Sequence, residues 1–217
     1  DVYKRQPTHS SCVWGLGMSM NWIAVALSMD VPRKLVMPAR VHDVDLAIWR
    51  DSSGRCHAWV DRCPHRGMRL SRGFVRGNSL ACIYHGWQYD DAGICSHIPA
   101  HPSMTPPKSI CAQTYHCLES GGVIWAAIKD PGDTMPPDTD AFQPLRSVPV
   151  SCSAAHVERQ LSVGDAPLGI KDALVIAIQP QDDSACMMHV LTDPAEDRKA
   201  MSIATETLRN SLERSVA

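Results

Sequence analysis

Four residues of this chain have the types and the spacing of a metal-cluster site. Cys63 and His65 form a Cys-x-His pair, and Cys82 and His85 form a Cys-x-x-His pair after sixteen intervening residues. Each pair offers one soft thiolate and one imidazole, so two loops that meet can supply two ligands to each of two irons. The set predicts a [2Fe–2S] cluster with a potential of roughly −150 to +300 mV. The chemistry of such a cluster is one-electron transfer.

A tetrahedral zinc site is the main alternative, because two cysteines and two histidines also bind zinc. Zinc fingers usually place both histidines in the same half of the motif, with two or more residues between the ligands of a pair. Here each half is mixed, and one residue separates Cys63 from His65. The spacing therefore favours the iron–sulfur cluster.

The sequence around these ligands resembles the Rieske [2Fe–2S] family, in the branch of the ring-hydroxylating and demethylating oxygenases. The resemblance rests on Cys-Pro-His-Arg-Gly-Met-Arg-Leu-Ser at 63–71 and Tyr-His-Gly-Trp-Gln-Tyr at 84–89, and it extends over residues 22–128. Rieske proteins of respiratory complexes carry an additional, disulfide-linked cysteine in each cluster loop. Neither 66–68 nor 83–84 contains one, which indicates the lower-potential branch.

Five neighbours of the ligands are expected to surround the cluster: Arg66, Gly67, Tyr84, Gly86 and Trp87. The two glycines would let backbone N–H groups approach the cluster sulfurs and tune the potential. Trp87 would shield the cluster from water. Arg66 and Tyr84 have three open roles: a hydrogen bond near the cluster, a place on a docking surface, or a structural role. The ligand histidines should expose their second ring nitrogens at the loop tips, as an electron exit.

No catalytic residue can be assigned from the sequence. The oxygenases that the motif resembles bind a further mononuclear iron through two histidines and a carboxylate. Beyond residue 130 the chain holds His156 and His189, each isolated and interpreted as a core or surface histidine. His97 and His101 are closer together, but Pro99 between them favours an irregular loop, for which substrate or partner contact is the preferred role.

The elements that position the ligands are expected to be short strands. Residues 34–128 alternate between strand patterns and turn residues, as in an antiparallel β domain. Three hairpins are expected, each across a glycine-containing connection: 46–50 with 57–60, 87–89 with 94–95, and 113–118 with 123–128. The predicted fold is mainly β, with a Rieske-type antiparallel β domain over 33–130 that carries two cluster-binding loops and a small α/β unit behind it.

Residues 1–32 are expected to form an N-terminal arm, of which 1–6 are a candidate non-native remnant. The stretch 10–29 carries no charge and superficially resembles a signal peptide or a membrane anchor. Gly15, Gly17 and Asn21 interrupt its apolar character. A packed arm is therefore favoured over a membrane segment.

A proline-rich linker is expected over 131–147, because its prolines can neither continue a ladder nor start a helix. The small α/β unit would cover 148–217, as a domain of its own or as a shortened remnant of an oxygenase catalytic domain. Its expected elements are a strand at 148–152, a helix at 153–161 and strands at 174–178 and 187–191.

The last element of the unit is expected to be a helix after residue 193. Asp193 would cap it, with Pro194 at its first position and Glu196 three residues after the cap. An apolar stripe would pack it onto the preceding strands. The stripe consists of Met201, Ala204, Leu208 and Leu212.

Charge and cysteine content limit the partners and the compartment. The 21 basic and 23 acidic residues give a net charge of −2, so no electrostatic case exists for nucleic acid or an anionic membrane. Two of nine cysteines are claimed by the cluster, and the odd total argues against a disulfide framework. The others are interpreted as thiols in a reducing cytoplasm: Cys12, Cys56, Cys95, Cys111, Cys117, Cys152 and Cys186.

The leading hypothesis is an electron-transfer component of an oxygenase-like oxidoreductase system. It would take single electrons from a separate reductase or ferredoxin and pass them to a protein acceptor or towards a small-molecule substrate. The alternative is an atypical Rieske monooxygenase or demethylase with an unrecognised mononuclear iron site, and a second alternative is a redox-sensing module. The resemblance also implies a homo-oligomer, although the missing iron triad weakens the case for the trimer found in oxygenases.

Overall fold

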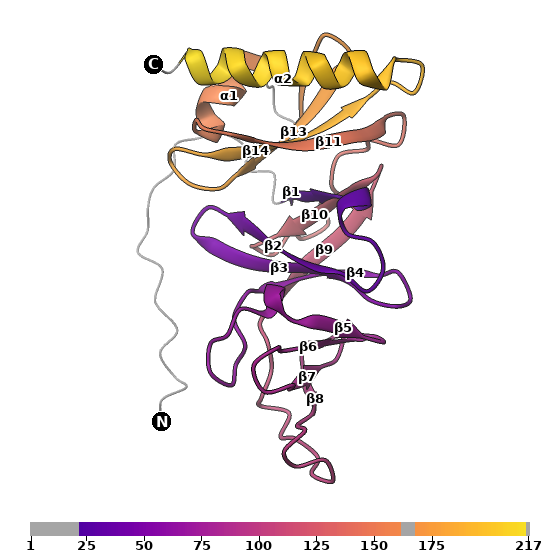
Figure 1. Cartoon of the computed structure of the whole chain (residues 1–217), viewed down its shortest axis with the longest axis vertical. Coiled ribbons are helices and arrows are strands. Elements are labelled where there is room, and N and C mark those ends of the chain that lie inside the picture. Colours follow the sequence, from indigo (N-terminus) through magenta and orange to yellow (C-terminus); the bar gives the residue numbers. More distant parts are fainter. Residues whose placement is uncertain (1–21, 162–167, 216–217) are drawn as a thin grey trace.

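The computed structural model describes residues 22–161 and 168–215 of the 217-residue chain. Three antiparallel sheets follow one another along the long axis of the molecule (Figure 1). A four-stranded C-terminal sheet lies at the top of this view, a six-stranded sheet in the middle and a smaller four-stranded sheet at the bottom. The expected mainly β architecture is confirmed.

The middle sheet has the strand order β1-β10-β9-β4-β3-β2. Its strands are β1 (Trp22–Leu27), β2 (Val36–Val41), β3 (Val44–Arg50), β4 (Cys56–Val60), β9 (Thr114–Ser120) and β10 (Val123–Ala127), with a short 3-10 helix η1 (Ser28–Asp30) after β1. All five residues of β10 are buried, because alternate side chains enter two different cores. Ile124 and Ala126 pack within the cluster domain, whereas Trp125 faces the C-terminal sheet.

The three expected hairpins are present. They join β3 to β4, β7 to β8 and β9 to β10. Gly54 and Gly93 have φ angles of +102° and +82° in the first two connections, a left-handed region that glycine adopts without a side-chain penalty. The glycine signals in the sequence therefore identified the turns correctly.

The small sheet carries the segments expected to bind the cluster. It consists of β5 (Phe74–Arg76), β6 (Ser79–Ala81), β7 (Gln88–Tyr89) and β8 (Cys95–His97), and the 3-10 helix η2 (Leu70–Arg72) precedes it. The first loop runs into η2, and the second loop joins β6 to β7. Leu80 and Tyr89 pack with Trp49 and Trp59 of the middle sheet, so a buried core anchors both loops.

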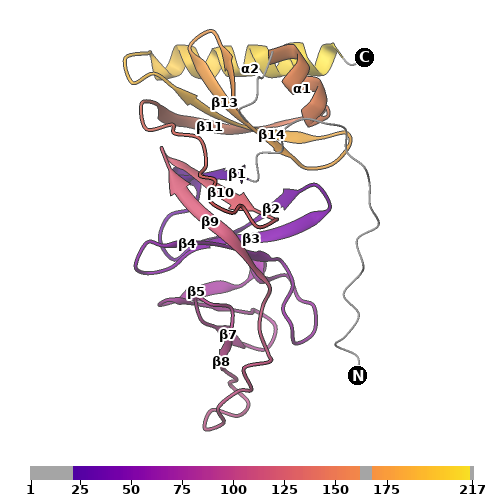
Figure 2. The same cartoon turned by 180° about the vertical axis from the view of Figure 1, so that it is seen from behind.

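The C-terminal sheet has the order β11-β14-β13-β12, with both helices on its outer face (Figures 1 and 2). Its elements are β11 (Gln143–Val150), α1 (Ala154–Leu161), β12 (Leu168–Lys171), β13 (Leu174–Pro180), β14 (Cys186–Thr192) and α2 (Arg198–Arg214). Ile176 and Val190 point to the helices, whereas Val175 and Leu191 pack against β1 and β10. The expected apolar stripe of α2 packs on this sheet as predicted.

Three features differ from the sequence expectations. β1 lies inside the range expected as an arm and pairs with β10. β11 begins within the expected linker and includes Pro144, which an edge strand tolerates at the irregularity between Pro144 and Arg146. β12 was not expected at all. Residues 1–6 and the first part of the uncharged stretch, up to residue 21, lie outside the described residues.

The cap of α2 is also different from the one expected. Asp197, not Asp193, precedes the helix, and its carboxylate accepts the N–H of Lys199 at 3.0 Å. Asp193 instead accepts the N–H of Ala195 at 2.8 Å and closes a turn after β14. Both aspartates satisfy nearby backbone donors, but the helix starts one turn later than the Pro194 signal indicated.

Among the described residues, no helix is long and apolar enough to cross a membrane.

Candidate iron–sulfur centre

The two loops that carry the candidate ligands have the same backbone hydrogen bonds. In the first loop, the carbonyl of Cys63 accepts the N–H of Gly67 at 2.8 Å, and the N–H of Cys63 donates to the carbonyl of Met68 at 2.8 Å. In the second loop, the carbonyl of Cys82 accepts the N–H of Gly86 at 3.0 Å, and the N–H of Cys82 donates to the carbonyl five residues on at 2.9 Å. Each cysteine is thus held at the base of a closed turn.

The backbone conformation of these turns requires glycine. Gly67 and Gly86 have φ angles of +72° and +70°, and their N–H groups close the turns onto the cysteine carbonyls rather than pointing at the sulfurs. A Cβ at Gly86 would also lie 2.9 Å from Cγ of Pro99, which follows β8. The segment after β8 therefore packs directly on the second loop.

The two candidate thiols are buried together. Cys63 and Cys82 are each 2% exposed and belong to the same core. Burial raises the pKa of Cys82, the N–H groups of Tyr84 and His85 oppose that rise, and the nearby Cys63 thiol adds to it. Backbone N–H groups thus do approach a candidate cluster sulfur, but they come from the two residues before Gly86.

Tyr89 is a functional candidate that the sequence analysis did not identify. Its ring is fully buried, and its hydroxyl lies 3.1 Å from Sγ of Cys63. Burial raises the pKa of Tyr89 well above its usual range, and the neighbouring Cys63 raises it further. The phenol therefore stays protonated and can donate to a thiolate at Cys63. The sequence offered one signal for Tyr89, which is that it ends the second motif at 84–89.

The two candidate imidazoles lie at the outer end of the loops. The ring centroids of His65 and His85 are 4.6 Å apart, with an interplanar angle of 62°. His85 is exposed and His65 is half-buried, because the indole of Trp87 stacks on the His65 ring at 4.1 Å and 6°. Burial lowers the pKa of His65, and the charges of His85 and Arg66 lower it further.

The surface around the imidazoles combines apolar and basic side chains. Ile83 and Tyr84 are both 55% exposed, and the Tyr84 ring lies 3.9 Å from the ring of His85. Arg66 is exposed beside His65, and a Cβ at Gly67 would lie 3.3 Å from Nε of Arg62. Arg66 and Tyr84 thus lie on the outer surface of the loops.

The donor set fits a [2Fe–2S] cluster. Two buried thiols and two outward imidazoles from a pair of equivalent loops can supply two ligands to each iron, and Tyr89 can donate to one of the sulfurs. These four donors would bind two irons, two to each, and need not meet around one ion. Within residues 22–161 and 168–215, no group of three or more His, Cys, Asp or Glu side chains could hold a single metal ion.

The other histidines singled out in the sequence lie on separate elements. His97 ends β8, and His101 is exposed in the turn that follows. His156 lies in α1, with Nε2 at 2.8 Å from Oγ of Ser215. His189 is buried in β14, where its ring nitrogens contact Ser147 and Gln179. The described structure brings none of His97, His156 and His189 onto a common element.

Comparisons with known proteins agree with this geometry. The family model of the Rieske [2Fe–2S] domain matches residues 21–116. The oxidoreductase NdmD of Pseudomonas putida is 41% identical over 111 residues, which are 51% of this chain and 19% of that protein. The 4β-methylsterol monooxygenase of Methylococcus capsulatus is 39% identical over 119 residues, 54% of this chain and 32% of that protein. The chain thus spans about a fifth to a third of the length of these relatives.

The fold is shared with solved structures over a greater length. Apo dicamba monooxygenase superposes with a TM-score of 0.73 at 18% identity and covers 89% of this chain and 85% of that one. NdmA of Pseudomonas putida superposes with a TM-score of 0.71 at 19% identity, covering 90% and 79%. At such low identity these matches establish the fold alone. Taken with the curated relatives, the family match shows a Rieske [2Fe–2S] domain over residues 21–116, and this part of the chain resembles the N-terminal Rieske domain of Rieske oxygenases.

Proposed function

We propose that this chain transfers single electrons in an oxygenase-like oxidoreductase system, with Cys63 and Cys82 as ligands of one iron and His65 and His85 as ligands of the other. One observation carries the proposal. Two loops with the same hydrogen-bonded backbone bury both thiols and turn both imidazoles outward. This is the arrangement that a mixed-ligand [2Fe–2S] cluster needs.

The protein's own residues would tune the site and connect it to solvent. A bound cluster supplies a reversible one-electron couple. The hydroxyl of Tyr89 and the N–H groups of Tyr84 and His85 stabilise negative charge on the cysteine sulfurs. The exposed ring of His85 offers the short path by which an electron enters or leaves.

A protein electron donor fits the surface around His85. Between Arg62 and Leu118 the sequence contains six basic and two acidic residues, although the whole chain has an acidic excess. Arg62 and Arg66 lie on the first loop, and the exposed Ile83 and Tyr84 lie on the second. A reductase or ferredoxin with an acidic patch and an apolar centre would match this surface, because such complementarity speeds encounter and sets orientation.

The metal content of the holoprotein tests the assignment. We expect two irons and two acid-labile sulfides per chain after anaerobic reconstitution. His85→Cys should keep a cluster and lower its potential, because a thiolate replaces a neutral imidazole. Cys63→Ala should abolish the cluster. An unchanged EPR spectrum of the reduced Cys63→Ala variant would contradict the proposed ligand set.

A second candidate function is that of a Rieske monooxygenase or demethylase acting on a small molecule. It is favoured by the match to dicamba monooxygenase, which extends through the C-terminal sheet as well as the Rieske domain. Under this proposal the catalytic iron would come from residues not yet identified or from a neighbouring subunit of a homo-oligomer. A third tightly bound iron that supports O₂-dependent turnover would establish this candidate over the first.

We also propose a reducing compartment such as the cytoplasm. None of the eight cysteines of the described ranges is paired in a disulfide, and six of them are buried. Exposed Cys111 would not remain reduced in an oxidising compartment without protection. Fractionation of the native host cells, with alkylation of Cys111 as the redox readout, tests this assignment.

A further inference from the structure

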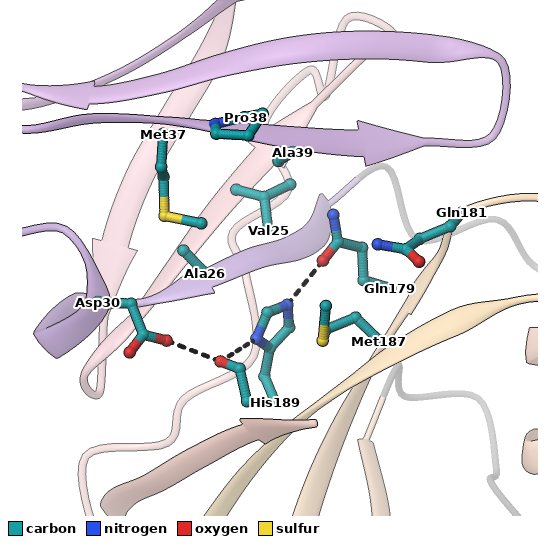
Figure 3. Close-up of a pocket in the computed structure, with 11 residues that line it drawn as sticks. Val25, Ala26, Asp30, Met37, Pro38, Ala39, Gln179, Gln181, Met187 and His189 are labelled. Atoms are coloured by element: carbon teal, nitrogen blue, oxygen red, sulfur yellow. Dashed lines mark hydrogen bonds between the residues drawn. The ribbon is translucent and has the colours of Figure 1, made fainter. Parts of the chain in front are cut away.

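A cavity of about 350 Å³ lies between the Rieske domain and the C-terminal sheet. β1 and β2 form one wall, and β13 and β14 form the other (Figure 3). Most of the lining is apolar, but four polar residues of the wall are joined by hydrogen bonds. They are Asp30, Ser147, Gln179 and His189.

Together with the backbone carbonyl of Arg40, the four residues form a hydrogen-bonded chain that starts and ends in the Rieske domain. Asp30 Oδ2 lies 2.7 Å from Ser147 Oγ, which in turn lies 2.9 Å from His189 Nδ1. His189 Nε2 lies 2.9 Å from Gln179 Oε1, and Gln179 Nε2 donates to the carbonyl of Arg40 at 2.8 Å. Figure 3 shows the contacts from Asp30 to Gln179 along one side of the cavity. The series of hydrogen bonds therefore crosses between the two units twice, from Asp30 to Ser147 and from Gln179 to Arg40.

The carbonyl of Arg40 determines where the hydrogens lie. A carbonyl oxygen only accepts, so it fixes the amide of Gln179 with its NH₂ towards Arg40 and its oxygen towards His189. The amide oxygen also only accepts, so Nε2 of His189 must carry a hydrogen. A neutral His189 would then have a bare lone pair at Nδ1, facing Ser147.

One hydrogen is missing if His189 is neutral and Asp30 is ionised. Ser147 has a single hydroxyl hydrogen, but it lies within hydrogen-bond distance of two acceptors, the Asp30 carboxylate and the bare Nδ1. One of the two contacts would then bring two lone pairs together. A proton on Nδ1 removes the conflict, because His189 then donates to Ser147 and Ser147 donates to Asp30. A proton on Asp30 would restore the chain in the opposite direction.

We propose that Asp30, Ser147 and His189 form a proton-binding site that couples the charge of His189 to the hydrogen bond between the Rieske domain and the C-terminal sheet. With the proton bound on His189, the Ser147 hydroxyl points to Asp30 and ties η1 to β11. Without it, the hydroxyl turns to Nδ1, and the exposed Asp30 carboxylate is left to water. The bond between the units is therefore gained as pH falls through the pKa of His189 and lost as pH rises through it.

Among the described residues that line the cavity around His189, Asp30 is the one that carries a charge. β13 contributes Gln179, β11 contributes Ser147, and Arg146 beside it bonds to Glu206 of α2 instead. Burial lowers the pKa of His189 to about 4. Under the proposal, the Asp30 carboxylate, which Ser147 contacts at 2.7 Å, acts against that effect. The remaining wall is uncharged: Val25, Ala26, Met37, Pro38, Ala39, Gln181 and Met187.

The experiment is an NMR titration of the oxidised holoprotein with ¹⁵N-labelled histidine. The His189 signal is assigned by its absence in His189→Gln. We expect the Nε2–H tautomer at high pH, and a pKa of His189 that is lower by about one unit or more in Asp30→Asn, because a nearby carboxylate favours the imidazolium by about that much. Ser147→Ala should lower the pKa in the same direction by removing the link.

Asp43→Asn is the matched control, since Asp43 is an exposed aspartate of the Rieske domain outside the cavity wall. It should leave the His189 titration unchanged. Equal pKa values of His189 in the wild type, Asp30→Asn and Ser147→Ala would overturn the proposal. An Nδ1–H tautomer at high pH would overturn it as well. If Asp30→Asn does not fold, the tautomer and the Ser147→Ala titration decide the question.

Discussion

At the scale of single residues, the hydroxyl of Tyr89 is the feature with the most direct effect on the redox couple. It is buried at 3.1 Å from Sγ of Cys63. A hydrogen bond to sulfur favours the more negative, reduced state, so we expect Tyr89→Phe to lower the reduction potential. A differential of about 1 kcal/mol corresponds to a shift on the order of 40 mV for one electron. A redox titration followed by visible absorption measures it.

Tyr115→Phe is the control for that titration. Tyr115 is half-buried in β9, and its hydroxyl accepts from Gln113, which immediately precedes that strand. Its removal should leave the potential unchanged. If Tyr89→Phe and Tyr115→Phe had the same potential as the wild type, the hydrogen bond of Tyr89 would have no role in tuning the site.

Gly86 permits a second prediction at the residue scale. The cost of a side chain in the left-handed backbone can be separated from the cost of its contact with Pro99. Gly86→Ala should lose about 1 kcal/mol to the left-handed backbone and more to the approach of Pro99 at 2.9 Å. Gly77 has a φ of +61° with nothing near its Cβ position, so Gly77→Ala should pay the backbone cost alone. Urea unfolding should show the larger loss for Gly86→Ala, together with a lower cluster content. Equal losses would show that Pro99 does not restrict the loop.

Residue types and spacing point to the four candidate ligands, because a mixed-ligand cluster takes thiol and imidazole pairs on meeting loops, and their binding of iron stays a prediction. They were not enough to predict Tyr89, since the partner of a buried hydroxyl depends on how β7 packs against the first loop. Backbone N–H groups were expected near the sulfurs, but the sequence does not show which residues supply them. Gly67 and Gly86 use their N–H groups to close the turns, and Tyr84 and His85 approach the sulfur instead.

At the scale of elements, the start of α2 shows how two capping signals compete. The side chain of Asp197 accepts from Lys199, so we expect Asp197→Ala to reduce the free energy of unfolding by about 1 kcal/mol. Asp193→Ala should cost less, because Asp193 closes an exposed turn outside the helix. Chemical denaturation of both variants compares them. A greater loss for Asp193→Ala would mean that the helix begins earlier than described.

Hairpins and helices were predicted well where the local sequence contains the turn glycines or the apolar stripe that define the element. The connections of β3 to β4 and β9 to β10 carry their glycines, and α2 carries its apolar stripe. β1 and β11 were placed less well, since their burial comes from distant segments. Pro144 argued against a strand, but no local signal says that β11 is an edge strand, where a missing N–H is tolerated.

At the scale of the whole molecule, the Rieske domain and the C-terminal sheet share one apolar core. Leu191 of β14 is fully buried in it, together with Trp22, Trp125 and Val175. We expect Leu191→Ala to cost about 2–5 kcal/mol of stability, as truncation of a buried leucine does elsewhere. Because the core belongs to both units, unfolding should remain a single transition in far-UV circular dichroism and in cluster absorbance.

Ile170→Ala is the control for Leu191→Ala, since Ile170 is 70% exposed on β12. Its stability should lie within about 0.5 kcal/mol of the wild type. If Leu191→Ala lost far-UV circular dichroism at a lower denaturant concentration than it lost cluster absorbance, the two units would be coupled more weakly than their contacts indicate. The sequence predicted both units but not this contact, because no local pattern shows which face of β13 meets β10.

The closed turns of the two ligand loops have a consequence for how the cofactor is acquired. Each turn is fastened by two backbone hydrogen bonds that involve no ligand side chain, and each is anchored in a core of tryptophan and leucine. The backbone hydrogen bonds and the packed core thus offset the entropy cost of ordering these segments, and iron binding does not have to. A delivery protein would meet a receptor that is already shaped, and cluster transfer would not have to wait for a folding step.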